Sequence, residues 1–263
     1  MAGGVQYWPT LTTDDFTDVD LAKSIAVLPV AAIEQHGPHL PLEVDAVIND
    51  AILTAALAEV PEALSVLVLP AQVIGYSEEH TSFPGTLTFS AETLLATWRE
   101  IGESVARAGV RKLVIFNSHG GQNELMAVVA RQLRVSAGLF VATAGWSQLA
   151  TYDDLVTPEE RQFGIHGGAL ETSLMLHIAP EKVRNDRIRN FPSTGQQVAD
   201  SSTHLAPTGR NAYGWMTEDL NETGAVGDAT QATSALGEEI LHRAAKGLVE
   251  YLEDVDRVTA QSS

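Results

Sequence analysis

The sequence contains no cysteine among its 263 residues. Disulfide bonds and thiolate metal ligands are therefore excluded, and any bound metal must be held by His, Asp or Glu side chains. Long apolar runs are also absent, since no stretch reaches the roughly 18 apolar residues that a membrane-spanning helix needs. The opening residues, Met-Ala-Gly-Gly, have neither the basic region nor the apolar core of a secretory signal. We therefore expect a cytoplasmic protein with no membrane partner.

Basic residues are scarce. Sixteen Lys and Arg stand against 34 Asp and Glu, which gives a formal net charge of −18. A surface this acidic repels phosphate groups, so nucleic acid and anionic membranes are excluded as partners, whereas a small-molecule substrate is compatible with it. Apolar residues make up 44% of the chain, enough for one substantial core. Because no linker or internal repeat interrupts it, we expect residues 1–263 to form a single domain.

Apolar runs alternate with amphipathic stretches along most of the chain. The runs are unbroken rather than alternating, which is typical of strands buried on both faces, and the stretches between them have helical periodicity. This order predicts an α/β protein whose parallel sheet is covered by helices on both faces. Residues 185–230 are expected to be extended loops around the site, with short strands among them as the alternative, and residues beyond about 254 to be frayed. The expected strands are 24–30, 64–70, 112–116 and 138–143, and the expected helices 44–60, 90–109, 124–135, the end of 164–178, and 234–252.

The segment from Ile33 to Asp45 combines metal-ligand side chains with a rigid loop. It reads Ile-Glu-Gln-His-Gly-Pro-His-Leu-Pro-Leu-Glu-Val-Asp. Glu34 and His36 point the same way if the backbone is extended, because side chains alternate along a strand. The two prolines keep a helix from starting inside the loop, so Asp45 falls in the first turn of the next helix. Carboxylate and imidazole groups can thus converge on one point, as a divalent-metal site requires.

A histidine follows a second predicted strand. His119 lies in the segment Asn-Ser-His-Gly-Gly-Gln-Asn, residues 117–123. In an open parallel sheet, ligands bind at the carboxyl ends of the strands, so His119 is expected beside Glu34 and His36. The two glycines leave room for close approach of the backbone.

A third cluster leads into an apolar helix and contains His166 and Glu171. A glutamate at the start of such a helix indicates a metal ligand or a general base that faces a cleft. His166 is suited to protonate a leaving nitrogen, because the ordinary pKa of histidine lies close to neutral pH. His and carboxylate donors without cysteine suit zinc, manganese or iron(II). A metal with an open position makes hydroxide available near neutrality, so the predicted chemistry is metal-assisted hydrolysis.

The same residues can also be explained by structural roles that involve neither catalysis nor metal binding. Asp45 and Glu171 can be helix-start residues that interact with the helix dipole, and His119 can be a structural histidine. Convergence of several donors on one sheet edge favours the metal site. No G-x-S-x-G, P-loop or complete G-x-G-x-x-G stretch offers a competing chemistry.

With these motifs the chain resembles the creatininase (creatinine amidohydrolase) family. The resemblance covers most of residues 24–180, in order and at similar spacing, and is specific for the family but not for one member. The motifs are Leu28-Pro29-Val30, Glu34-Gln35-His36-Gly37 with Asp45, Phe83-Pro84-Gly85-Thr86, Asn117-Ser118-His119-Gly120-Gly121, and His166-Gly167-Gly168 with Glu171-Thr172-Ser173, and the Gly224-Ala225-Val226-Gly227-Asp228 turn is a weaker match.

The resemblance implies a three-layer α/β/α, Rossmann-like fold and a homo-oligomer, usually a hexamer. It also implies one or two divalent metals per chain, zinc or manganese, with iron as the alternative. Glu34, Asp45 and His119 match the ligands of one metal. His36 and Asp45 match ligands of the other, so Asp45 is expected to bridge the two.

Catalytic and substrate-binding roles follow from the same resemblance. His166 matches the catalytic histidine, and Trp146 matches a tryptophan on a flap over the substrate, with Asn123 as a further substrate-binding residue. The sequence departs from creatininase proper at Gly121, where that enzyme supplies a glutamate to the second metal. We expect Glu171 or water to fill this gap.

The predicted function is a metal-dependent amidohydrolase that cleaves a C–N bond of a small cyclic or linear amide through a metal-activated water. The departure at Gly121 favours a family member other than creatininase proper. The alternatives are a hydrolase of C–C or ester bonds in a cyclic ketone or lactone, a peptidase of a small modified peptide, and an inactive ligand-binding scaffold. The intact donor residues argue against the inactive scaffold.

Overall fold

Five parallel strands form the central sheet of the computed structural model, which describes residues 4–209 and 211–260. The sheet order is β1-β3-β2-β4-β5, and each neighbouring pair is parallel. In the central strands every side chain is buried, which accounts for their unbroken apolar sequences. The strands are β1 (Gly4–Tyr7), β2 (Ile25–Val30), β3 (Ser65–Val68), β4 (Lys112–Asn117) and β5 (Phe140–Gly145).

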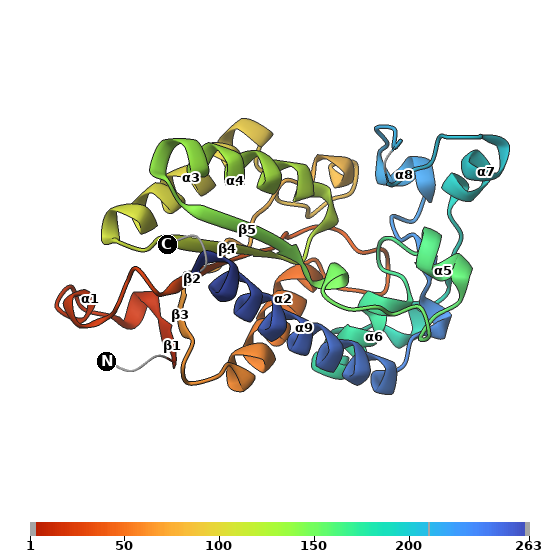
Figure 1. Ribbon diagram of the computed structural model, residues 1–263. Helices are drawn as coiled ribbons and strands as arrows, with labels where there is room; N and C mark the ends of the chain where they lie inside the picture. Colours follow the sequence, from red (N-terminus) through yellow and green to blue (C-terminus); the bar gives the residue numbers. More distant parts are fainter. Residues whose placement is uncertain (1–3, 210, 261–263) are drawn as a thin grey trace.

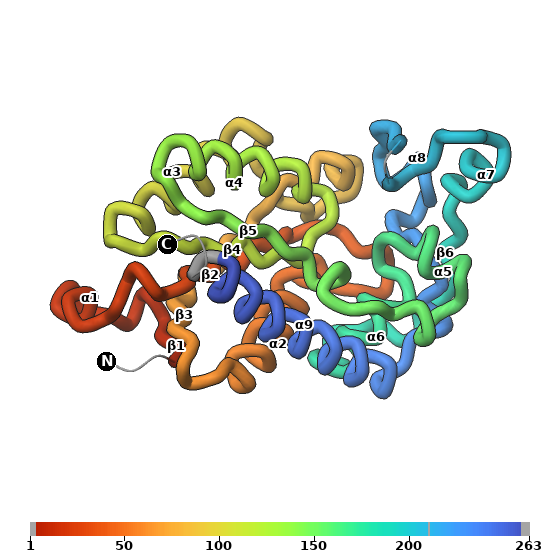
Figure 2. The backbone as a smooth tube through the Cα atoms, viewed as in Figure 1, coloured from red at the N-terminus to blue at the C-terminus, as the bar shows by residue number. Residues whose placement is uncertain are grey.

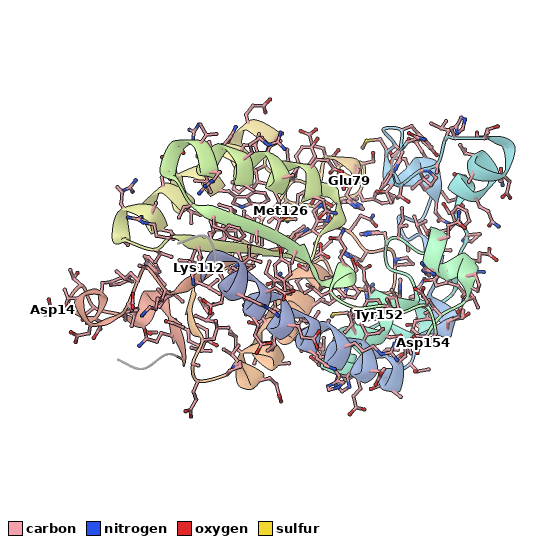
Figure 3. The ribbon with its side chains drawn as sticks, viewed as in Figure 1. Asp14, Glu79, Lys112, Met126, Tyr152 and Asp154 are labelled. Carbon is pink, nitrogen blue, oxygen red and sulfur yellow. The ribbon has the colours of Figure 1, made fainter. Side chains whose placement is uncertain are left out.

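Helices cover both faces of this sheet (Figure 1). On one face, α3 (Ala91–Ala108) and α4 (Asn123–Ala137) pack against the sheet, and Met126 points from α4 into that interface (Figure 3). On the other face lie α2 (Val44–Glu59), α6 (Ala169–Ile178) and α9 (Ser234–Ala260). The predicted three-layer α/β/α fold with a mostly parallel sheet is confirmed.

Local signals set the ends of α3 as expected. The Ser90 side chain accepts a hydrogen bond from the backbone N–H of Thr93 and caps the helix. Gly109 ends it at φ 112°, a conformation that favours glycine. Strand and helix positions elsewhere in the sheet region agree with the predicted ranges to within a few residues.

The end of the last helix corrects the prediction of fraying from about residue 254. Helix α9 continues to Ala260 because its later turns still contact the core. Val255 is only 4% exposed, and the Asp256 carboxylate lies 2.7 Å from the ammonium group of Lys112 in β4.

Several short elements were not predicted. The edge strand β1 and the helices outside the three layers lack long periodic patterns, so local sequence does not identify them. The loops predicted over residues 185–230 contain the short strands that were allowed for, β6 (Asn190–Phe191) and β7 (Gly227–Asp228). Within the described parts of this range, 185–209 and 211–230, the structure also has two α-helices that were not predicted, α7 (Thr194–Ser201) and α8 (Thr217–Leu220). The remaining short α-helices are α1 (Asp15–Asp18) and α5 (Pro158–Phe163).

The topology brings distant loops to one end of the molecule. Strands β2 and β4 are neighbours and pair from Ile25 opposite Lys112 to Val30 opposite Asn117, so the loops that follow them leave the sheet side by side. The segments with α5, α7 and α8 gather beyond this same end (Figures 1 and 2). Among the helices in residues 4–209 and 211–260, none has the length and apolar character needed to cross a membrane.

Candidate metal centre

Four predicted ligands meet where β2 and β4 end. Glu34 and His36 follow β2, Asp45 lies in the first turn of α2, and His119 follows β4, and all four are at most 4% exposed. The Nδ1 atom of His119 lies 3.2 Å from Glu34 Oε1 and 3.6 Å from Asp45 Oδ2. The Nε2 atom of His36 lies 3.7 Å from Asp45 Oδ1. Glu34, Asp45 and His119 therefore form one group that could hold a metal ion.

The start of α6 supplies two more side chains. Glu171 Oε2 lies 3.8 Å from His36 Nε2. His36, Glu171 and Asp45 form a second group whose ligand atoms are close enough together to hold a metal ion. Asp45 belongs to both groups, as a bridging ligand would. His166 Nδ1 lies 3.7 Å from Glu34 Oε1, so His166 faces the first group. Glu171 also accepts a hydrogen bond of 2.6 Å from the Gly167 N–H, which orients its carboxylate.

Backbone carbonyls determine which ring nitrogen of each histidine carries a proton. His36 Nδ1 lies 3.0 Å from the Glu34 carbonyl, His119 Nε2 lies 2.8 Å from the Tyr76 carbonyl, and His166 Nε2 lies 2.6 Å from the Gln35 carbonyl. A carbonyl can only accept, so each of these nitrogens donates. The other nitrogen of each ring then faces the carboxylates, and when it is unprotonated it could bind a metal held between them, as metal-bound histidine does.

Three of the five buried side-chain polar atoms that lack a hydrogen-bond partner in the described residues lie at this cluster. They are Glu34 Oε2, His36 Nε2 and Asp45 Oδ2, and the other two are His39 Nδ1 and Trp98 Nε1. An unpaired buried carboxylate oxygen is costly, and a cation offsets that cost. These orphaned atoms and the His and carboxylate donor set fit a divalent metal.

The carboxylates change the pKa values of the two innermost histidines. Burial lowers the pKa of His36, but the neighbouring Asp45 carboxylate outweighs this effect and raises it to about 9. Burial acts in the same direction on His119, and the Glu34 carboxylate raises its pKa to about 10. Protons on these rings balance the buried negative charge, and a divalent cation would displace them.

The outer groups are shifted mainly by burial. Burial and the charge of His36 hold the pKa of His166 well below its ordinary value, so its ring is neutral. Burial lowers the pKa of His80 to about 4 and raises the pKa of Glu171 to about 7. A neutral His166 beside the carboxylates can accept a proton at Nδ1.

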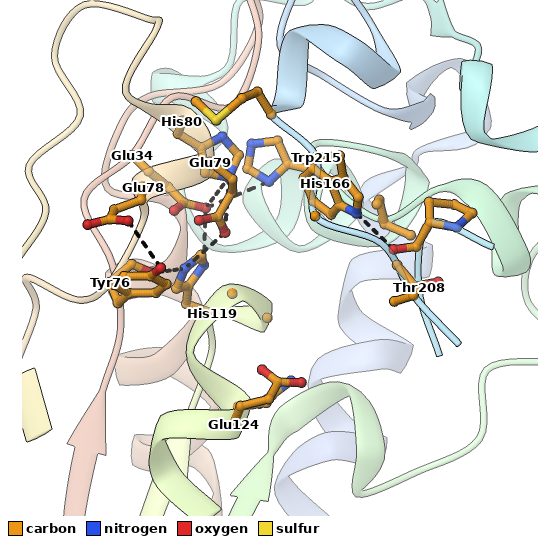
Figure 4. Close-up of a pocket in the computed structure, with 18 of the residues that line it drawn as sticks. Glu34, Tyr76, Glu78, Glu79, His80, His119, Glu124, His166, Thr208 and Trp215 are labelled. Carbon is orange, nitrogen blue, oxygen red and sulfur yellow. Dashed lines mark hydrogen bonds and ion pairs between the residues drawn. The ribbon is translucent and has the colours of Figure 1, made fainter. Parts of the chain in front are cut away.

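A Glu-His pair in the loop between Gly75 and Gly85 belongs to the site but was not predicted from the sequence. Glu79 and His80 belong to the short 3-10 helix Glu78–His80 and reach the same cluster (Figure 4). His80 Nε2 lies 3.4 Å from Glu34 Oε1, and Glu79 Oε1 lies 3.7 Å from His119 Nε2. The only local signal is the Glu-His dipeptide just before Phe83-Pro84-Gly85.

A cavity of about 800 Å³ opens onto the cluster. Its wall includes the aromatic residues Tyr76, Tyr213 and Trp215 and the predicted residue Asn123. The amide oxygen of Asn123 accepts a hydrogen bond of 3.0 Å from the Asn117 side chain, which fixes its orientation.

Trp146 lies elsewhere than predicted. The prediction puts it on a flap over the substrate, but its side chain is 5% exposed in the hydrophobic core and does not line this cavity. It follows β5 directly and packs against Tyr152, with ring centroids 5.9 Å apart. Trp215, from a loop more than 60 residues later in the chain, supplies an indole at the cavity instead.

Comparisons with known proteins agree with this geometry. The family model described as creatininase, creatinine amidohydrolase, matches residues 9–252. The mycofactocin precursor peptide peptidase of Mycobacterium ulcerans (strain Agy99) is 34% identical over 219 residues, which are 81% of this chain and 78% of that protein. The creatinine amidohydrolase of Pseudomonas putida is 34% identical over 188 residues, 64% of this chain and 69% of that protein.

Solved structures share the fold over nearly the whole chain. One described as "Creatininase Mn" superimposes with a TM-score of 0.75 at 25% sequence identity and covers 94% of this chain and 97% of that one.

Proposed function

The chain belongs to the creatininase family of hydrolases, and from this premise we propose that it cleaves a C–N bond of a small amide with the help of a divalent metal. The observation that carries this proposal is the pair of buried donor groups that share Asp45 at the base of the cavity. The set consists of carboxylate and imidazole groups, which suit a divalent metal that activates water, so water is the proposed attacking group.

The proposed metal ligands are divided between the two groups. Glu34, Asp45 and His119 would hold one ion, and His36, Asp45 and Glu171 the other. When bound, the metal supplies the Lewis acidity that makes a water nucleophilic near neutral pH. Glu171 thereby takes the role that the sequence analysis suggested for it, as the carboxylate of the second group.

His166 is proposed to move the proton. Its Nε2–H is engaged by the Gln35 carbonyl at 2.6 Å, so only Nδ1 is free to exchange a proton in the cavity. Because the ring is neutral, it first accepts the proton of the attacking water. It then protonates the leaving nitrogen, so that a good leaving group departs as the C–N bond breaks.

The cavity accommodates more than a very small ring. Its volume of about 800 Å³ lies in the range of sites that bind drug-sized ligands. A second candidate function, removal of a residue from a short peptide, is compatible with this volume and with the peptidase relatives that align over 81% of the chain. The bond broken is an amide in both cases.

Metal identity and assembly belong to the same proposal. Manganese or zinc suits these ligands, with iron(II) as the alternative. We propose a homo-oligomer, with six chains as the number suggested by family membership.

The proposed function is tested by removing and restoring the metal. Purified protein is stripped with a chelator, reloaded with Mn²⁺ or Zn²⁺, and screened against creatinine, N-formyl amines, short peptides and cyclic ketones. We expect cleavage of a C–N bond only in the reloaded protein. Equal activity of the stripped protein, or cleavage of the cyclic ketones alone, would contradict the proposal.

A ligand variant and a matched control complete the test. His119→Ala should lose metal, measured by elemental analysis, and activity, while circular dichroism stays unchanged. His242→Gln removes an exposed imidazole on α9, outside the cavity wall, and should keep both. Full metal occupancy in His119→Ala would refute the assignment of this ligand.

A further inference from the structure

Glu79 occupies the space that a side chain at position 121 would need. A Cβ atom added to Gly121 would lie 2.0 Å from Glu79 Oε1, far closer than two such atoms can approach. Gly121 has no positive φ, so its backbone does not require glycine. The requirement is spatial. The Glu79 carboxylate comes from a different loop and occupies the volume that Gly121 leaves free. Gly121 is the position at which creatininase proper has a glutamate, so Glu79 places a carboxylate where the sequence has none.

A chain of hydrogen bonds determines which nitrogen of His80 carries its proton. The Gly37 N–H donates to Gln35 Oε1 at 2.9 Å, which identifies the oxygen of that amide. The amide nitrogen then donates to the Gly224 carbonyl at 2.8 Å and, with its other hydrogen, to His80 Nδ1 at 2.7 Å. The proton of His80 must therefore be on Nε2.

The His80 N–H is directed at two carboxylates. Its Nε2 lies 3.4 Å from Glu34 Oε1 and 3.9 Å from Glu79 Oε1. The side chains of Glu34 and Glu79 are 1% and 14% exposed, and a carboxylate oxygen of one lies within 4.8 Å of a carboxylate oxygen of the other, close enough to share a metal ion. Two buried carboxylates this close repel each other unless a cation or a proton lies between them.

We propose that Glu79 is a further carboxylate ligand of the metal centre, acting with Glu34 on the side nearest His119, and that His80 is the positioning residue that holds both carboxylates. Glu34 Oε2 is buried without a hydrogen-bond partner, as a ligand atom would be. Figure 4 shows Glu79 reaching between the rings of His80 and His119 at the wall of the cavity. This inference rests on the metal-dependent function proposed above.

The test measures the affinity for Mn²⁺ alone and needs no substrate. Chelator-stripped wild type, Glu79→Gln and Glu78→Gln are titrated with Mn²⁺ by calorimetry, and bound Mn²⁺ is counted by electron paramagnetic resonance. Glu78 is the matched control because it belongs to the same short helix but is hydrogen-bonded to the Tyr76 hydroxyl at 3.2 Å. We expect Glu79→Gln to weaken one Mn²⁺ site by about 10- to 100-fold and Glu78→Gln to change it by less than about threefold.

The outcomes separate this inference from the proposed function. If wild type and Glu79→Gln bind Mn²⁺ equally well, Glu79 is not a ligand, and the proposed metal-dependent function is unaffected. Wild type that binds neither Mn²⁺ nor Zn²⁺ overturns both. An equal loss in Glu79→Gln and Glu78→Gln shows a general effect of charge and also refutes the assignment.

A second pair of variants tests the role of His80. Glutamine retains an N–H donor at the end of its side chain, whereas leucine has none. His80→Gln should keep Mn²⁺ affinity within about fivefold of wild type, and His80→Leu should lose about 10- to 100-fold. If both variants bind Mn²⁺ like wild type, His80 does not position the carboxylates.

Discussion

The two ring nitrogens of each histidine in this site have different partners. One is hydrogen-bonded to a backbone carbonyl, and the other faces the carboxylates. Three backbone carbonyls take the N–H groups of His36, His119 and His166. The other nitrogens of His36 and His119 face the carboxylates, which raise the pKa values of both rings, so these rings carry an extra proton near neutral pH when no metal is bound. A bound metal would therefore release protons from these two rings.

Replacing Glu171 separates its role as ligand from its role in capping. In Glu171→Gln the amide oxygen can still accept the Gly167 N–H, so the local hydrogen bond survives. Only the charge beside His36, 3.8 Å away, is lost. We expect the second metal site to weaken by about 10- to 100-fold and the free energy of unfolding to change by less than about 1 kcal/mol.

Metal titration together with a melting curve measures both effects. Glu181→Gln, which removes an exposed carboxylate shortly after α6, is the control and should change neither. Unchanged metal affinity in Glu171→Gln would leave a mononuclear site as the better description.

His39 predicts a pH dependence of stability in the metal-free protein. The ring is fully buried, donates to the Gly167 carbonyl at 3.0 Å and stacks on Phe191. Burial, with the charges of His36 and Arg189, lowers the pKa of His39 to about 4, below the ordinary 6.5. The unfolded chain thus binds the proton more readily, and the stability that neutral His39 provides is lost as the pH falls from about 6.5 toward 4.

The comparison with His39→Gln isolates this effect. Glutamine can keep a donor to Gly167 but does not titrate. Between pH 7 and pH 5, urea unfolding should show wild type losing about 2 kcal/mol more than the variant. Parallel losses in the two proteins would mean that His39 is protonated in the folded state at pH 5.

At the scale of secondary-structure elements, the position of α6 depends on close packing with α9. A Cβ atom on Gly237 of α9 would lie 2.0 Å from the backbone oxygen of Ser173 in α6. Glycine therefore lets the two helices approach with backbone against backbone. Since Glu171 is in the first turn of α6, this contact also sets the depth at which its carboxylate enters the site.

Gly237→Ala should destabilise the protein although alanine is the better helix former. The added methyl group meets backbone that cannot rotate away, so we expect a loss of about 1–3 kcal/mol in the free energy of unfolding. Gly102→Ala in α3 is the comparison, because the nearest atoms to its methyl group belong to the Leu133 side chain, which can shift, and not to backbone. Denaturant unfolding of both variants decides the point, and equal stability of the two would contradict the packing argument.

For the whole molecule, charge and assembly oppose each other. A chain with a net charge of −18 repels its copies, and this repulsion weakens as salt screens it. We nevertheless expect light scattering at about 0.15 M salt to give about six times the 28.1 kDa of one chain. A fully active monomer would contradict the proposed hexamer.

The central fold and the convergence of the four inner side chains can be predicted from the sequence. Unbroken apolar runs identify β2 and β4, and parallel strands present their carboxyl ends at one edge, so Glu34, His36 and His119 had to lie near one another. Asp45 follows because two prolines delay the start of α2. These inferences depend on local signals and on one general property of parallel sheets.

The outer part of the site depends on contacts that no local pattern encodes. Trp146 is buried and Trp215 lines the cavity, although each directly follows a glycine in the sequence. The Glu79-His80 pair reaches the cluster because its loop folds over the end of the sheet, beside Gly121. Periodicity carries no information about how a loop of this kind folds.

By itself, the sequence determined the layered α/β architecture and the residue types that can bind a metal. Backbone propensity and burial patterns act over a few residues, so they can be read along the chain. The tertiary structure decided which nitrogen of each histidine faces the carboxylates and which carboxylate fills the space beside Gly121. Those outcomes depend on partners far apart in sequence, such as the Gly224 carbonyl that orients Gln35 across 189 residues, and only the folded chain brings them within hydrogen-bond distance.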